Sequence, residues 1–91
     1  MRFDEKRVLV TGASRGIGRA IALQFAGAGA RVAVHYETNQ SAAETTLAEL
    51  PGTGHTLCAG DVANPDAVAQ LVTKTVTDLG GLDILVNNAG I

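Results

Sequence analysis

Three glycines near the start of the sequence have a spacing that can place a phosphate group. Gly12, Gly16 and Gly18 follow the pattern G-x-x-x-G-x-G. The first would permit a tight turn, the second would let backbone approach an anion, and the third would let a helix pack closely on a sheet. The first turn of that helix would offer N–H groups and a partial positive charge to a diphosphate. The spacing predicts a dinucleotide site, with a plain turn as the alternative. A Walker A loop is excluded, because no Gly-Lys-Ser or Gly-Lys-Thr closes the turn.

Two further polar segments come shortly after apolar runs. Asp61 and Val62 follow the run at residues 56–59, and the sequence Asn-Asn-Ala-Gly at residues 87–90 follows the run at 84–86. Open α/β sheets bind ligands at the carboxyl ends of their strands, so we expect both segments to lie beside the glycine turn. Each has a simpler explanation, because Asp61 could cap a turn and the asparagines could end a strand.

Four short apolar runs must position these segments. They lie at residues 8–10, 32–34, 56–59 and 84–86. Their hydrophobicity is mostly continuous rather than alternating, which is typical of parallel strands buried on both faces. The sequence therefore predicts four buried strands.

Helical periodicity fills the three intervals between these runs. Apolar residues recur at helical spacing before Gly29 in the first interval: Ile17, Ile21, Phe25 and Ala28. In the second, residues 41–44 (Ser-Ala-Ala-Glu) fit a capping box for a helix that runs to about Leu50. In the third, Asn64 is the expected N-cap and Pro65 the first helical residue. One apolar stripe follows: Val68, Leu71, Val72, Val76 and Leu79.

The alternation of strands and helices defines the expected fold. The order βαβαβαβ implies a parallel sheet with right-handed crossovers. We expect the α/β class, as a Rossmann-type doubly wound sheet with strand order 3-2-1-4 that is incomplete at its C-terminal side. Residues 1–91 would form one NAD(P)-binding domain.

The motifs together resemble those of the short-chain dehydrogenase/reductase family. Residues 11–18 are similar to its cofactor turn, and residues 61–62 and 87–90 match two further motifs in the right order. The resemblance covers the whole chain and is closest to the 3-oxoacyl-carrier-protein reductase-like members. It implies an oxidoreductase that moves hydride between a nicotinamide dinucleotide and a small carbonyl or alcohol substrate.

The resemblance also implies which residues would bind the cofactor. Asp61 would hydrogen-bond the adenine amino group, Val62 would pack near the adenine ring, and residues 88–90 would line the ribose side. The implied set is Gly12, Ser14, Arg15, Gly16, Ile17, Gly18, Tyr36, Asp61, Val62, Asn88, Ala89 and Gly90.

The choice between NADP(H) and NAD(H) depends on the end of the second run. NAD sites place an acidic residue near this point. By resemblance, Tyr36 holds the deciding position and is not acidic. The forked guanidinium of Arg15 could donate charge-assisted hydrogen bonds to a 2′-phosphate, and Thr38 and Asn39 could add further hydrogen bonds. Glu37 departs from the NADP pattern, because a carboxylate beside that phosphate would be unfavourable. NADP(H) is favoured, and NAD(H) stays open.

Composition limits the other possibilities. The 91 residues carry a net charge of −2, which disfavours a nucleic-acid partner or a polybasic membrane patch. No apolar run is long enough to span a membrane, and the N-terminus does not resemble a secretory signal. The single cysteine, Cys58, fits a cytoplasmic protein and an inert buried thiol. His35 and His55 are expected to be structural or solvated, and no metal-ligand spacing occurs.

The resemblance implies catalytic residues that this sequence does not contain. The family uses a Ser, an Asn and a Tyr and Lys four residues apart, whereas Tyr36 is the single tyrosine here and Gln40 lies four residues after it. We assign no catalytic residue, and expect these groups beyond Ile91. The alternative is a stand-alone dinucleotide-binding or assembly module without catalysis. An uncharged edge strand at residues 84–86 predicts that this piece self-associates or is only marginally stable. We also expect a homo-oligomer.

Overall fold

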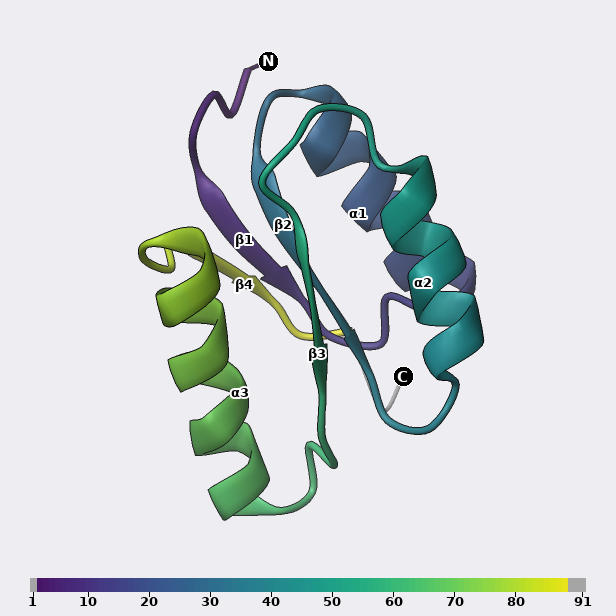
Figure 1. Cartoon of the computed structure of the whole chain (residues 1–91), viewed down its shortest axis with the longest axis vertical. Coiled ribbons are helices and arrows are strands. Elements are labelled where there is room, and N and C mark those ends of the chain that lie inside the picture. Colours follow the sequence, from purple (N-terminus) through teal and green to yellow (C-terminus); the bar gives the residue numbers. More distant parts are fainter. Residues whose placement is uncertain (1, 89–91) are drawn as a thin grey trace.

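The computed structural model describes residues 2–88 and shows a parallel sheet with helices on both faces (Figure 1). In chain order the elements are β1 (Arg7–Val10), α1 (Gly16–Gly27), β2 (Arg31–Tyr36), α2 (Gln40–Glu49), β3 (Thr56–Ala59), α3 (Pro65–Leu79) and β4 (Ile84–Val86). The four strands lie in the order β3-β2-β1-β4, and each neighbouring pair is parallel. The predicted fold class, element order and strand order are confirmed.

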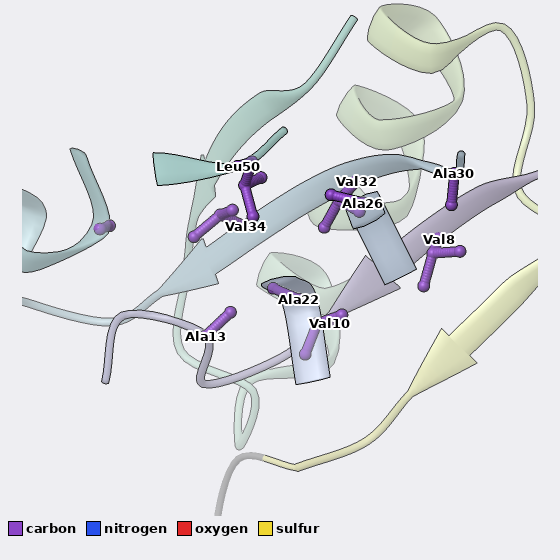
Figure 2. Close-up of a cluster of buried hydrophobic side chains, with 10 residues drawn as sticks. Val8, Val10, Ala13, Ala22, Ala26, Ala30, Val32, Val34 and Leu50 are labelled. Atoms are coloured by element: carbon purple, nitrogen blue, oxygen red, sulfur yellow. The ribbon is translucent and has the colours of Figure 1, made fainter. Parts of the chain in front are cut away.

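The two central strands bury both of their faces. Val8 and Val10 of β1 lie in a core with the small residues of α1 and α2, while Leu9 lies in a second core with Leu71 and Leu79 of α3. Figure 2 shows the first core, where strand valines contact Ala22 and Ala26 of α1. Continuous apolar runs in β1 and β2 therefore correspond to two-sided burial, as predicted.

Helix α1 has the predicted position but faces the sheet with different residues. Gly18, Ala22 and Ala26 are its buried residues, whereas Ile17 is 69% exposed. The expected stripe is therefore wrong at Ile17, whereas its members Ile21 and Phe25 are partly buried against the core. Small residues face the sheet because they allow the helix to approach β1 and β2 closely, and Gly29, at φ +100°, follows the helix end as expected.

Helix α2 begins one residue before the predicted capping box. Asn39 is the N-cap, and its side-chain oxygen accepts a hydrogen bond from Ala42 N at 3.0 Å. The Glu44 carboxylate accepts instead from the Gln40 side chain. The capping box at residues 41–44 was therefore wrong, and an asparagine, one of the strongest N-cap residues, is the cap.

Helix α3 begins as predicted but buries only part of its apolar stripe. The Asn64 side chain caps the helix by accepting hydrogen bonds from Asp66 N and Ala67 N, and Pro65 is the first helical residue. Leu71, Thr75 and Leu79, spaced four residues apart, are buried, whereas Val68 and Val76 are 36% and 42% exposed. The predicted apolar face of α3 is wider than the face that packs on the sheet. Val68 and Val76 therefore face outward.

Strand β4 is at the edge of the sheet and is only partly buried. Leu85, which pairs with Leu9 in the register of β1 and β4, is 55% exposed. The expectation of four buried strands is therefore wrong for both edge strands, because β3 buries only Cys58 and no residue of β4 is fully buried. Self-association through the edge of β4 stays a prediction.

All four strands point the same way, with their carboxyl ends directed toward the lower part of Figure 1. The turns that follow β1, β2 and β3 lie together there and lead into the three helices. Within residues 2–88, no helix has both the length and the apolar character needed to cross a membrane.

Candidate functional site

A groove of about 690 Å³ lies at the carboxyl ends of the strands. Four segments form it: the glycine turn, the end of β2 with the loop after it, the turn after β3, and Asn88 after β4. Its volume is within the range of small-molecule and cofactor sites. Eight of the predicted residues line it: Gly12, Ser14, Arg15, Gly16, Ile17, Tyr36, Val62 and Asn88. The structure thus brings together three of the motifs that lie far apart in the sequence.

The glycine turn is bonded to the segment after β4. The Thr11 hydroxyl oxygen accepts a hydrogen bond from Asn88 N at 2.8 Å, and the Asn88 side-chain amide donates to Gly12 O at 3.2 Å. Gly12 itself has φ +64°, which favours glycine. Asn88 therefore fixes the start of the turn.

Gly16 and Gly18 serve different purposes. A Cβ built on Gly16, at φ +62°, would meet no atom within 4 Å, so this backbone faces open space in the groove. A Cβ on Gly18 would lie 2.2 Å from Gly12 O and 2.5 Å from the Asn88 amide nitrogen. Gly16 leaves room for a ligand against the backbone, while Gly18 permits close packing of α1 and does not line the groove.

The N-terminus of α1 is the one helix start in residues 2–88 that no side chain caps. Its N-cap residue, Arg15, has an extended backbone and forms no side-chain cap. Asn39 and Asn64 cap the other two helices. The first-turn N–H groups of α1 therefore lack a side-chain acceptor beside the open space at Gly16. This arrangement fits a diphosphate.

Polar and charged residues form the rim of the groove. Arg15 is exposed and makes no ion pair with any residue of the described range 2–88. Tyr36, Glu37 and Thr38 are further lining residues, and Glu37 is exposed to solvent. Asn39 also lines the groove, although its side-chain oxygen is already bonded to Ala42 N as the α2 cap. The rim thus offers one unpaired cation and one carboxylate.

The two residues of the segment after β3 are placed differently. Val62 lines the groove. Asp61 lies outside the groove lining, and its carboxylate accepts a hydrogen bond from Ala63 N at 2.8 Å, as a turn-capping residue does. The predicted adenine contact of Asp61 stays a prediction. The predicted positions Ala89 and Gly90 lie outside the described residues.

Two buried polar residues hold the turn: the sequence interpretation expected His35 to be structural or solvated but not to contact the turn, and it missed Thr46. His35 is fully buried, and its ring nitrogens lie 2.9 Å from Gly12 N and 2.7 Å from Gly60 O. Thr46 of α2 is also fully buried and donates to Ser14 O at 3.2 Å. A signal for Thr46 existed, because it lies three residues after Ala43 on the buried face of α2.

The remaining titratable candidates lie away from the groove. Burial raises the pKa of the Cys58 thiol to about 11, so it stays protonated and inert near neutral pH. His55 accepts a hydrogen bond from Val32 N and contacts Pro51 O. Among residues 2–88, no three metal-ligating side chains come together.

Comparison with known proteins assigns the family. Residues 6–91 match the family model described as short chain dehydrogenase. The chain belongs to this family, which confirms the resemblance drawn from its motifs, and it corresponds to the N-terminal part of the family fold.

Individual relatives are consistent with this assignment. The chain is 46% identical over 91 residues to glucose 1-dehydrogenase of Gluconobacter oxydans, covering 98% of this chain and 34% of the relative. It is 48% identical over 88 residues to a 3-oxoacyl-[acyl-carrier-protein] reductase of Staphylococcus aureus, covering 94% of this chain and 36% of the relative. The chain thus spans about a third of the length of these curated relatives.

Solved structures show the same fold. A dehydrogenase/reductase from Sinorhizobium meliloti superposes with a TM-score of 0.92 at 41% identity, over 99% of this chain and 36% of that one. A short-chain dehydrogenase from Burkholderia cenocepacia, solved in complex with NADP, gives a TM-score of 0.89 at 47% identity, over 100% of this chain and 38% of that one.

Proposed function

We propose that this protein is an NADP(H)-dependent oxidoreductase that transfers hydride between nicotinamide and a small carbonyl or alcohol substrate. Residues 1–91 would supply its NAD(P)-binding Rossmann domain. The observation that carries the proposal is the uncapped N-terminus of α1 beside the open backbone of Gly16, in a chain of the short-chain dehydrogenase family. A relative solved with NADP supports the choice of ligand class.

The residues of this chain would bind and orient the cofactor. The first turn of α1 and Gly16 would hold the diphosphate, because N–H donors and the positive helix end meet there. Asp61 and Val62 would contact the adenine, and residues 88–90 the ribose. When bound, the dinucleotide would supply or accept the hydride. We assign no proton transfer to any of these side chains.

The preference for NADP(H) rests on the non-acidic residue Tyr36 at the end of β2 and, most directly, on Arg15. Its guanidinium lies at the rim without an ion-pair partner among residues 2–88, so it is available to a 2′-phosphate. Replacing it by alanine should weaken NADPH binding by about tenfold, as expected for loss of one charge-assisted contact. NADH binding should change little, because that ligand lacks the phosphate. Fluorescence titration of both ligands measures the difference.

A matched control separates this contact from general charge effects. Arg19, one turn further along α1, pairs with Glu49 and does not line the groove. Arg19→Ala removes the same charge and should leave both affinities close to those of the wild type. Equal weakening of NADPH and NADH in Arg15→Ala would contradict the assignment to the 2′-phosphate.

A further inference from the structure

His35 connects two turns that border the groove. It lies in β2, is fully buried, and reaches Gly12 N with Nδ1 at 2.9 Å and Gly60 O with Nε2 at 2.7 Å. A carbonyl oxygen only accepts, so Nε2 must carry a proton. A backbone N–H only donates, so Nδ1 must be unprotonated. The two contacts therefore select one neutral tautomer of the imidazole.

The contact with Gly12 lies at the point where the glycine turn begins. The Gly12 peptide N–H donates to His35, and the Gly12 carbonyl accepts from the side chain of Asn88 at 3.2 Å. Ala13 N in addition donates to His35 O at 2.9 Å. The first residues of the turn are thus fixed by β2 and by Asn88, which follows β4. Without His35 the Gly12 N–H would lose its acceptor in a part-buried position, which disfavours the present turn conformation.

We propose that His35 is a positioning residue of the dinucleotide site. Its Nδ1 holds the glycine turn in the conformation that leaves Gly16 open to the ligand, and the bond to Gly60 O keeps the required tautomer. The inference rests on the proposed function, because it concerns affinity at the same groove. His35 acts through Gly12.

The other end of β2 offers a matched control. His55 makes the same pair of contacts there: its Nδ1 accepts from Val32 N at 3.1 Å, and its Nε2 lies 2.7 Å from Pro51 O. It does not line the groove. Removing its imidazole should lower stability without changing ligand affinity.

The test is titration of the intact protein with NADPH, together with thermal unfolding. His35→Asn retains an acceptor near the position of Nδ1, His35→Gln retains a donor near the position of Nε2, and His35→Leu retains neither. We expect the Leu and Gln variants to bind NADPH about tenfold more weakly, because the Gly12 N–H loses its acceptor. The Asn variant should bind close to the wild type, and His55→Leu should bind as the wild type does.

A spectroscopic measurement checks the mechanism without a ligand. The ¹⁵N shifts of the His35 ring in the wild type should show a protonated Nε2 and an unprotonated Nδ1. A protonated Nδ1 would overturn the proposal. So would unchanged affinity in His35→Leu, or equal losses in the Asn and Gln variants, which would indicate a packing effect.

The two proposals fail in different ways. If the wild type binds NADPH but the His35 variants do not differ as stated, only the role of His35 is wrong. If the wild type binds no dinucleotide, the proposed function fails and this inference fails with it. If His35→Leu does not fold, the comparison of the Asn and Gln variants decides.

Discussion

The two ends of the sheet are held by different chemistry. At the carboxyl end, uncharged groups of His35, Thr46 and Asn88 hold the glycine turn through hydrogen bonds. At the amino end, an ion pair joins the first residue of β1 to the residue before β4: Arg7 Nε and Asp83 Oδ2 are 2.9 Å apart. Arg7 also donates to Gly80 O at the end of α3.

This difference suits the dinucleotide site that we propose at the carboxyl end. The positive end of α1 attracts an anion only if no nearby carboxylate neutralises it. Hydrogen bonds between uncharged groups stiffen the turn without adding negative charge near the N-terminus of α1. The ion pair at the amino end of the sheet is too distant to affect that helix end. Glu37 is the exception at the rim, and it is exposed to solvent. The hydrogen bonds that hold the turn thus add no negative charge beside the N-terminus of α1.

The largest effect on stability is expected at the carboxyl end, for Gly18→Ala. The new methyl group would lie 2.2 Å from Gly12 O, a backbone atom that Asn88 holds in place. Either α1 or the turn must move, so we expect a loss of about 3 kcal/mol or more in the free energy of unfolding. Urea unfolding measures it.

Gly27→Ala, in the same helix, is the control for Gly18→Ala. Its methyl group would meet only the Pro51 side chain, at 3.9 Å. This variant should be neutral or slightly more stable, because alanine reduces the entropy of the unfolded chain. Similar losses in both variants would show that helix position, rather than contact with the turn, decides the effect.

A smaller, pH-dependent effect is expected at the amino end, for Asp83→Asn. Hydrogen bonds from Arg7 lower the pKa of Asp83 to about 2, so the folded state favours the carboxylate. The stabilisation should be complete above the ordinary Asp pKa near 4 and disappear as the pH falls through about 2. The variant should therefore be less stable than the wild type near neutral pH. The difference in stability between the variant and the wild type should disappear as the pH is lowered. Thermal unfolding measured across this pH range would show it.

Asp4→Asn is the control for the ion pair at the amino end. Asp4 pairs with Arg2 two residues away, and both side chains are more than half exposed. Such surface pairs contribute little to stability, so this variant should match the wild type at every pH. If Asp83→Asn remained less stable than the wild type by the same amount at the lowest pH, the stabilisation could not come from the ionised Asp83 carboxylate.

The fold was predictable because its signals are local. Apolar runs identified all four strands, and the glycine spacing identified the turn between β1 and α1. Which face of each helix is buried was harder to predict. Ile17 and Gly18 are adjacent in the sequence, and only the packing of α1 on the sheet decides which of them is buried. The exposure of Leu85 likewise depends on what covers β4, which no local pattern encodes.

The site was predictable only in its motifs. The glycine turn, Val62 and Asn88 carry a recognisable pattern, and the structure brings them to one groove. His35 and Thr46 contact the turn from 23 and 32 residues away. Their roles depend on the register of β1 with β2 and on the packing of α2. A polar residue in an apolar segment indicates burial with a partner, but not which partner.

The most direct test of the central claim is a map of backbone amide shifts by NMR during addition of NADP⁺ to the intact protein. We predict that the largest changes occur at residues 12–18, 36–39, 62–63 and 88. Arg7, His55 and Asp83 at the amino end should change little. Changes centred on the amino end, or no saturable change at residues 12–18, would contradict a dinucleotide site at the carboxyl end of the sheet.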